Sequence, residues 1–383
     1  MKGRRFSGNR INIMQLVWNL GMGGLEKLAI DICSHLPQDQ FSTSICVLQP
    51  GGAMESRVDS DRVDLLCVRQ NCGNDPTVPF RLARLLRKRK IDVLHSHAWG
   101  TLLEGIFAAK LARVPAVIHS EHSTTDRRRR RIIAQRAGWG MLNQVVAVSD
   151  AVADRMTNIV KYPRNKIHVI PNGVDLKQFR RLSSPRQELR EQFGLSSIEF
   201  LIGMVARFMP FKNHAGVLQA LPKLHAAGID AHLALAGSGP LREQLENLSE
   251  SLGITDKVHF LGNINETCRF LNSLDVFVSN STSGEGLSLA VLEAMACEVP
   301  VLATAVAEHP NVLNNGRAGS LIPPENEDAL VEALLHLAKK PEVLTALGQA
   351  GRRRVLDKYS YDGMMKAYQQ LYRRETGIGR LYA

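Results

Sequence analysis

The sequence has 383 residues, of which 44% are hydrophobic and 22% are charged, an ordinary balance for a soluble globular protein. A chain of this length is too long for one hydrophobic core, and we expect two domains of roughly 150–200 residues each. Aromatic residues make up only 5% of the chain, which argues against a stacking surface for nucleic acid. No stretch approaches the roughly 18–20 uninterrupted apolar residues that a membrane-spanning helix needs.

The start of the chain is basic, and the apolar run that follows it contains Asn12 and Gln15 and has no small-residue cleavage site. We therefore expect a first β-strand there and no signal peptide. The six cysteines are scattered, with no C-x-x-C pair and no zinc-site spacing. Buried thiols in a reducing cytoplasm are the simplest interpretation.

The net charge of +11 belongs to the first half of the chain. Residues 1–180 carry 28 Lys and Arg against 15 Asp and Glu, whereas the remainder carries 20 against 22. A solvated face explains such charge runs without any ligand. An anionic membrane or an anionic acceptor is the functional interpretation, because each basic residue near an anionic leaflet contributes about 1 kcal/mol. Nucleic acid is a third and weaker alternative.

Short β-branched segments alternate with amphipathic segments along the whole chain. The expected strands are residues 11–18, 42–48, 63–68, 91–95, 116–120, 144–149, 166–170, 199–205, 231–236, 257–261, 275–279, 300–303 and 320–322. The expected helices include residues 25–36, 101–112, 215–227, 241–252, 287–296 and 361–374.

This alternation predicts an α/β fold with two doubly wound, Rossmann-like parallel sheets. We expect the boundary after the turn-rich segment 171–175, giving an N-terminal domain of residues 1–178 and a C-terminal domain of residues 179–360. The final helix, about residues 361–383, is expected to pack back onto the first domain. Ligands of such sheets bind beyond the carboxyl ends of the strands.

In the first half, glycines 21, 23 and 24 follow the first expected strand and open a helix, but their spacing is not that of the dinucleotide fingerprint. Histidines cluster at two expected strand ends, as His95 with His97 and as His119 with His122. Their neighbours form no recognisable metal-ligand set. Hydrogen-bonded loop histidines are the alternative.

In the second half, Arg207 ends a buried expected strand and Lys212 follows five residues later. Two cations on one loop are what a diphosphate leaving group requires, because they offset the charge that grows as its bond breaks. Two exposed loop cations without a ligand are the alternative, which the apolar sequence 208–211 weakens.

The segment 283–293 places glycines around Glu285 just before a helix expected to start at about Leu287. A helix N-terminus offers unpaired backbone N–H groups and a partial positive charge, which suit a phosphate. Glu293 lies nearly two turns further on and is able to accept hydrogen bonds from hydroxyls of the same ligand. A helix cap with a solvated glutamate is the alternative.

Arg-x4-Lys followed about seventy residues later by Glu-x7-Glu resembles the donor site of glycosyltransferase family four, the large retaining GT-B group. Intermediate segments match in order: 236–240 resembles the family's Gly-rich turn, 260–262 its strand end before the base pocket, and 171–175 its interdomain connector. The loop 21–26 resembles the family's G-G-x-E loop. The resemblance spans nearly the whole chain.

The resemblance implies two Rossmann-like domains that face a cleft, and a role for each motif residue. Glu285 and His122 are the catalytic candidates beside the transferred sugar, and His97 lies on the acceptor side. The implied donor-binding residues are Gly23, Gly24, Arg207, Lys212, Gly237, Asn263, Ile264, Gly286, Leu287, Ser288 and Glu293.

The implied reaction is retaining transfer of a hexose or N-acetylhexosamine from a nucleotide diphosphate sugar, with uridine the favoured base, to a glycan or lipid-linked acceptor in cell-surface polysaccharide or glycoconjugate synthesis. No cofactor and no metal are expected, and Asp59-Ser60-Asp61 is interpreted as a chance D-x-D match. We expect a cytoplasmic protein with peripheral contact to the inner face of the cell membrane. The alternatives are a nucleotide-sugar epimerase and a non-catalytic basic scaffold.

One departure from the family's pattern falls after the expected strand 300–303. The family has a Gly-Gly pair and then a glutamate there, whereas this chain has Ala307-Glu308-His309-Pro310-Asn311. The departure affects the expected shape of the donor pocket and therefore the identity of the sugar.

Overall fold

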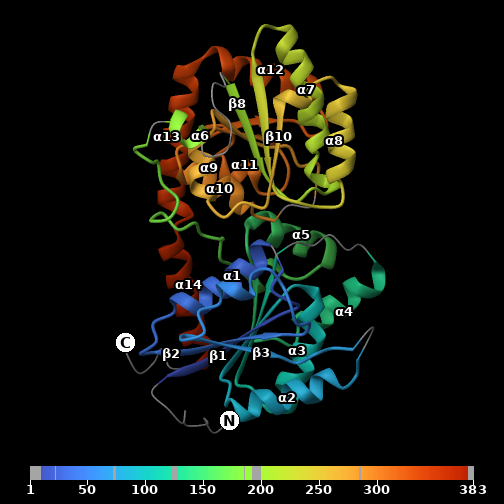
Figure 1. Ribbon diagram of the computed structural model, residues 1–383. Coiled ribbons are helices and arrows are strands. Elements are labelled where there is room, and N and C mark those ends of the chain that lie inside the picture. Colours follow the sequence, from blue (N-terminus) through green and yellow to red (C-terminus); the bar gives the residue numbers. More distant parts are fainter. Residues whose placement is uncertain are drawn as a thin grey trace. The chain divides into compact units, whose positions relative to one another are not determined.

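The computed structural model describes residues 10–21, 23–71, 75–122, 128–184, 186–191, 200–283 and 286–377. The chain divides into two compact units. The first comprises Met1–Asn172 together with Met364–Ala383, and the second comprises Gly173–Gly363. Figure 1 shows that each unit is built around a sheet with helices packed on its faces.

The first unit contains a seven-stranded parallel sheet in the order β3-β2-β1-β4-β5-β6-β7. Its strands are β1 Ile11–Val17, β2 Phe41–Val47, β3 Val63–Cys67, β4 Val93–His97, β5 Ala116–Glu121, β6 Gln144–Ala147 and β7 Ile167–Val169. Its helices are α1 Gly24–His35, α2 Val78–Lys88, α3 Trp99–Ala112, α4 Arg129–Trp139, α5 Asp150–Val160 and most of α14 Tyr361–Thr376.

The second unit contains a six-stranded parallel sheet in the order β10-β9-β8-β11-β12-β13. Its strands are β8 Phe200–Val205, β9 Ala231–Ala236, β10 Val258–Gly262, β11 Val276–Ser279, β12 Val301–Thr304 and β13 Ser320–Ile322. Its helices are α6 Arg186–Glu191, α7 His214–Ala226, α8 Arg242–Ser251, α9 Thr267–Ser273, α10 Leu289–Ala296, α11 His309–Val312, α12 Glu327–Lys339 and α13 Pro341–Lys358.

Every expected strand is present, so the prediction of two doubly wound parallel sheets is confirmed. The division between the units lies at Asn172–Gly173, ahead of the expected boundary at residue 178. The reason is that Val174 pairs with Ser360 in a parallel bridge, and Phe179 is buried in the core of the second unit. Within the described ranges, no helix is both long and apolar enough to cross a membrane.

Short polar side chains fix where several helices begin. Ser149 accepts a hydrogen bond from the Val152 N–H at the start of α5, and Asn213 and Asn326 cap α7 and α12 in the same way. Such caps satisfy backbone N–H groups that have no partner within the helix. The caps therefore set the points at which loops at the carboxyl ends of the strands turn into helices.

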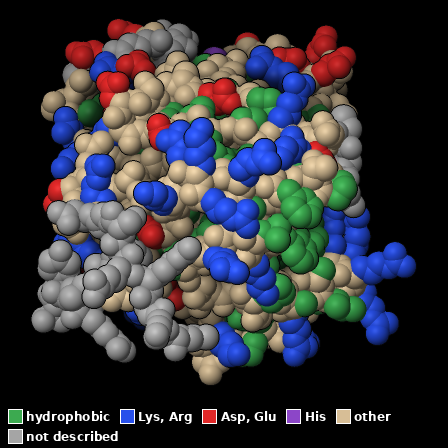
Figure 2. Space-filling view, turned by 90° about the horizontal axis from the view of Figure 1, so that it is seen from below, with side chains coloured by type: hydrophobic (Ala, Val, Ile, Leu, Met, Phe, Trp, Pro, Cys, Tyr) green, Lys and Arg blue, Asp and Glu red, His purple; other side chains and the backbone are tan. Residues whose placement is uncertain are grey.

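Basic side chains are prominent on the side of the first unit where α2 lies. Figure 2 views this side and shows Lys and Arg around a group of hydrophobic side chains. The sequences of α2 and α4 contain no acidic residue. Part of the positive charge of the first half of the chain therefore lies next to exposed hydrophobic side chains (Figure 2).

Buried polar side chains occupy the carboxyl ends of β1, β4 and β5. The His97 Nδ1 lies 3.1 Å from the His122 Nε2, and the His97 Nε2 lies 2.7 Å from the Gln15 Oε1. The Gln15 side-chain amide donates to the Tyr372 hydroxyl of α14 at 3.1 Å. These hydrogen bonds connect the sheet to the C-terminal helix.

His95 extends this connection on the neighbouring side. Its Nδ1 lies 2.8 Å from the Tyr372 hydroxyl, and its Nε2 lies 2.7 Å from the Ser120 Oγ. Its ring centroid is 4.2 Å from that of His97. We call His95, His97 and His122 the histidine cluster. Because burial disfavours the charged imidazolium, the pKa of His122 is lowered to about 3, and the pKa values of His95 and His97 lie well below 6.5.

These lowered pKa values predict that acid destabilises the first unit. Below pH 6.5 the unfolded chain takes up protons that the folded cluster does not, so the free energy of unfolding falls as pH falls. The loss is up to about 1.4 kcal/mol per pH unit for each histidine, and it continues until the folded pKa is reached. Urea unfolding at several pH values between 7 and 5 measures this fall in the free energy of unfolding. Tryptophan fluorescence reports on unfolding of the first unit, because Trp18, Trp99 and Trp139 all belong to it.

His97→Asn provides the control for this prediction. The variant lowers stability at neutral pH, but it removes one titrating group and makes the pH dependence shallower. Equal stability of the parent protein at pH 7 and pH 5 would contradict the prediction.

Candidate functional site

The strand order of the second unit places two of the sequence motifs side by side. β8 and β11 are neighbours, although β9 and β10 separate them along the chain. Such a reversal of strand order is where open α/β sheets bind ligands, outside the carboxyl ends of the strands. Arg207 follows β8, and Ser288 follows β11 and occupies the N-cap position of α10.

The loop after β8 carries the two predicted cations. Arg207 is exposed, whereas the next residue, Phe208, is fully buried and anchors the loop through hydrogen bonds with the backbone after β9. Lys212 ends a short 3-10 helix, and its Nζ lies 5.4 Å from the centre of the Phe211 ring. The apolar neighbours therefore hold both cations at the strand end.

A backbone hydrogen bond joins this loop to the one after β11. The Thr282 N–H donates to the Phe211 carbonyl at 2.8 Å. Lys212 and Ser288 line one small pocket together with the ends of the two strands. The structure thus brings a predicted cation to the start of α10, where backbone N–H groups and the helix dipole favour an anion.

The helix after this loop starts later than expected. α10 begins at Leu289, because Leu287 is buried in the core and Ser288 has extended backbone as the N-cap. Gly286 precedes both. Glu285 lies outside the described residues, so its catalytic role stays a prediction. Glu293 is only 7% exposed on the second turn of α10, and a carboxylate at such a position requires partners.

Three further residues predicted to bind the donor follow β9 and β10. Gly237 has a φ of +140°, and a Cβ there would lie 2.0 Å from the Ala206 carbonyl oxygen, so the close approach of this turn to the end of β8 requires glycine. The Ser238 hydroxyl donates to the Asn263 side chain at 3.1 Å. Ile264 is partly buried against the core. The turns after β8, β9 and β10 therefore lie together at one edge of the sheet.

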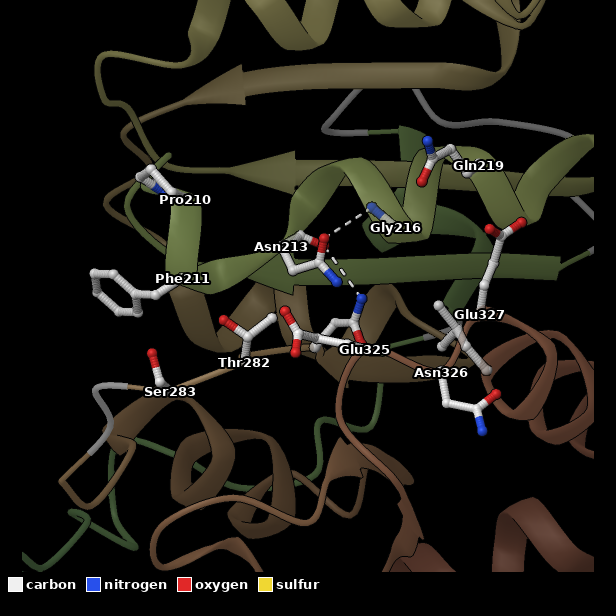
Figure 3. Close-up of a pocket in the computed structure, with 12 residues that line it drawn as sticks. Pro210, Phe211, Asn213, Gly216, Gln219, Thr282, Ser283, Glu325, Asn326 and Glu327 are labelled. Carbon is white, nitrogen blue, oxygen red and sulfur yellow. Dashed lines mark hydrogen bonds between the residues drawn. The ribbon is translucent and has the colours of Figure 1, made fainter.

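A cavity of about 600 Å³ opens between the start of α7, the loop after β11 and the start of α12 (Figure 3). The Asn280 side-chain amide donates to the Asn213 carbonyl at 3.2 Å, and the Asn213 side chain accepts from the Gly216 N–H at 3.2 Å. Thr282 and Glu325 also line the cavity. Sequence reasoning missed these lining residues, although an Asn before a helix is a capping signal.

The segment that departs from the family's pattern is well ordered by hydrogen bonds. Ala307 has a φ of +50°, a left-handed conformation that glycine adopts more readily. His309 is buried, and its Nδ1 lies 2.9 Å from the Thr304 carbonyl oxygen while its Nε2 lies 3.4 Å from the Ser279 Oγ. His309 thus connects the ends of β12 and β11.

In the first unit, β1 and β4 form the corresponding pair of neighbouring strands. Gly23 is the extended N-cap of α1, and Gly24 is the first residue of that helix. His97 ends β4, two residues beyond the expected strand, and it contacts His122 after β5. Sequence reasoning missed Gln15, for which the signal was a glutamine within an apolar strand.

His119 lies near the histidine cluster and helps to lower the pKa values of its members, whereas the D-x-D segment lies in a separate turn. The His119 Nδ1 lies 2.9 Å from the Ser96 Oγ, and its ring makes no hydrogen bond with the histidine cluster. Asp59 accepts a hydrogen bond from the Asp61 N–H at 3.1 Å, which forms a local turn before β3. Among the residues that the structure describes, no group of three or more His, Cys, Asp or Glu is arranged to hold a metal ion.

Two family profiles match this chain. "Glycosyltransferase Family 4" matches residues 22–178, and "Glycosyl transferases group 1" matches residues 185–354. The chain is 25% identical over 374 residues to the UDP-Gal:alpha-D-GlcNAc-diphosphoundecaprenol alpha-1,3-galactosyltransferase of Escherichia coli, covering 92% of this chain and 94% of that protein. It is 28% identical over 308 residues to the GDP-mannose-dependent alpha-(1-6)-phosphatidylinositol monomannoside mannosyltransferase of Mycolicibacterium smegmatis, covering 75% and 78%.

Solved structures show the same fold. A glycosyltransferase from Rickettsia africae superposes with a TM-score of 0.85 at 20% identity, covering 96% of this chain and 99% of that one. Anabaena Alr3699/HepE, solved in complex with UDP and glucose, superposes with a TM-score of 0.84 at 18% identity, covering 94% and 99%. The two parallel sheets, the ordered motifs and the two family matches together show that this chain belongs to the family-four glycosyltransferases of GT-B fold.

Proposed function

We propose that this glycosyltransferase moves a hexose or N-acetylhexosamine, with retention of configuration, from a UDP-sugar to a glycan or lipid-linked acceptor of cell-surface polysaccharide or glycoconjugate synthesis. The observation that carries the proposal is the pocket shared by Lys212 and Ser288, with Arg207 on the same loop as Lys212. A cation and a helix N-terminus at one point suit a diphosphate leaving group.

Each motif has a separate task in this proposal. Arg207, Lys212 and the backbone N–H groups from Gly286 to Ser288 hold the diphosphate and offset the charge that develops on it. Glu293 binds the ribose hydroxyls, and the turns at Gly237 and Asn263 hold the base. His122 and Glu285 contact the transferred sugar, and His97 lies on the acceptor side.

The proposed chemistry needs no covalent enzyme intermediate. The acceptor hydroxyl attacks the anomeric carbon on the face from which the diphosphate leaves, the bond from that carbon to the phosphate oxygen breaks, and a phosphate oxygen takes the hydroxyl proton. The protein mainly orients the reactants and stabilises charge. Because two cations and a helix terminus act on the diphosphate, we propose that transfer requires no divalent metal.

Two of the named relatives act on a diphosphoundecaprenol-linked or a phosphatidylinositol-linked substrate. These names support a lipid-linked acceptor here. Together with the excess of basic residues in the first half of the chain, they support our proposal of a cytoplasmic protein in peripheral contact with an anionic membrane.

A donor screen followed by product analysis tests the proposed reaction. We expect UDP and UDP-sugars to raise the unfolding temperature more than GDP or ADP compounds, because a ligand that binds only the folded state stabilises it. With the donor found, transfer in excess chelator should give a product of retained anomeric configuration by NMR. An inverted product, or activity that only manganese or magnesium restores, would overturn the mechanism. Release of an isomeric nucleotide sugar would favour an epimerase.

Removing either cation should weaken catalysis strongly. We expect Arg207→Ala and Lys212→Ala each to lower kcat/KM by roughly 10²–10⁴-fold, since both oppose charge that grows as the bond breaks. Lys257→Ala is the matched control, because this lysine forms an ion pair with Asp230 at 2.9 Å at the amino ends of β9 and β10, the opposite end of the sheet from the pocket. Activity of the Arg207 and Lys212 variants within threefold of the parent excludes them from the site.

We expect variants of Glu293 and Glu285 to differ in their affinity for free UDP. Glu293→Gln should weaken both free UDP and the UDP-sugar, by about 1–3 kcal/mol for a lost charge-assisted hydrogen bond. Glu285→Gln should bind free UDP almost normally while transfer falls, because its contact is felt mainly in the transition state. Calorimetry with nucleotide and donor on both variants measures this difference. Equal loss of free UDP by both variants contradicts the assignment.

A further inference from the structure

Exposed apolar side chains project from three neighbouring helices of the first unit. Phe80 on α2 is 66% exposed, Phe107 on α3 is 51% exposed, and Ile133 on α4 is 61% exposed. Leu111 near the end of α3 and Met141 after α4 are also exposed. Large apolar side chains gathered on one surface usually mark an interaction site.

The packing of the helices keeps these side chains on one surface. α2 and α3 share one hydrophobic core, in which Leu86 of α2 and Ala108 of α3 take part. α3 and α4 share another, through Ile106 and Trp139. An Arg87 guanidinium N–H of α2 also donates to the Leu111 carbonyl of α3. We call the surface that carries Phe80, Phe107 and Ile133 the α2–α3–α4 face.

Cations surround these apolar side chains. On α2, Arg84 and Lys88 follow Phe80 at intervals of four residues and therefore lie on the same side of the helix. On α3, Lys110 lies one turn after Phe107. On α4, Arg129 and Arg136 lie one turn before and one turn after Ile133. All five cations are exposed. Figure 2 shows blue side chains around the green ones on the side where α2 lies.

We infer that the α2–α3–α4 face docks onto an anionic lipid bilayer, with Phe80, Phe107 and Ile133 entering the interface and the cations contacting lipid phosphates. Apolar side chains flanked by Lys and Arg are the pattern by which helices lie on a membrane surface. Long basic side chains also extend their charged ends to the headgroups while their stems cover apolar surface. A nucleic-acid partner would use the charges but would leave Phe80 and Phe107 without a role.

This inference deepens the proposed membrane contact and rests on it, because it assigns that contact to named side chains. It also predicts two components of binding. The electrostatic component weakens with salt, since screening shortens as ionic strength rises. The apolar component persists, since burial of Phe80 and Phe107 is not screened.

Vesicle flotation with the full-length protein tests the inference. The probes are vesicles of phosphatidylglycerol with phosphatidylcholine and vesicles of phosphatidylcholine alone. We expect binding to the anionic vesicles that weakens between about 0.05 and 0.5 M salt but is not abolished. Phe80→Ser with Phe107→Ser should lower the partition coefficient by roughly tenfold or more at both salt concentrations. Arg84→Gln with Lys88→Gln should lower it mainly at low salt.

Leu356→Ser is the matched control, because Leu356 is a 48% exposed leucine on α13 of the second unit and should not affect binding. Donor hydrolysis and urea unfolding are measured on each variant. A variant that keeps its donor hydrolysis and its stability but no longer floats with the vesicles supports the docking face. Absence of donor hydrolysis in the parent protein would count against the proposed function and not against the docking face. Unchanged flotation of the double phenylalanine variant, equal binding to neutral vesicles, or displacement of anionic vesicles by duplex DNA would each overturn the inference.

Discussion

The hydrogen bond from the Thr282 N–H to the Phe211 carbonyl joins the two loops on which the candidate donor site of the second unit depends. It forms because β8 and β11 are adjacent in the sheet, and Asp275 strengthens that adjacency at the other end of the strands. Its carboxylate accepts from the Leu201 N–H at 2.7 Å and pairs with Arg190. The charged pair and the strand order together determine which loops meet.

The same constraint operates in the first unit. β1 and β4 are neighbours, and their register places Gln15 opposite His95. The Gln15 side chain then reaches His97 at 2.7 Å and Tyr372 of α14. A parallel sheet whose order reverses at its centre therefore assembles side chains that are far apart in the sequence, once in each unit.

Local sequence patterns were sufficient for the strands and for the fold class, because alternation of β-branched and amphipathic segments reflects burial within each segment. They were insufficient for the hydrogen bonds of the histidine cluster. The Gln15 and Tyr372 side chains meet only because of which strands are neighbours and where α14 returns to the sheet. Helix α10 begins two residues later than expected, because the extended backbone of the N-cap residue Ser288 leaves Leu287 outside the helix.

The docking face was also hidden from the sequence, for a different reason. Phe80 precedes a run of six cations within residues 81–90, and such a run by itself is typical of a solvated surface. Phe107 lies among other apolar residues of α3, and Ile133 follows Ile132 in α4, so neither is distinguished by the sequence of its own helix. Only the packing of α2, α3 and α4 against one another brings the three side chains to one surface.

The hydrogen bonds of the histidine cluster also determine which ring nitrogen of His122 carries the proton. The Gln15 Oε1 accepts from the His97 Nε2–H, so the other ring nitrogen of a neutral His97 is an acceptor. The His122 Nε2 therefore carries the proton of its hydrogen bond to His97, and its Nδ1 keeps a lone pair. With a pKa lowered to about 3, His122 stays neutral near pH 7. Such a side chain accepts a hydrogen bond from a hydroxyl but is a weak base, which agrees with the proposed mechanism in which a phosphate oxygen takes the hydroxyl proton.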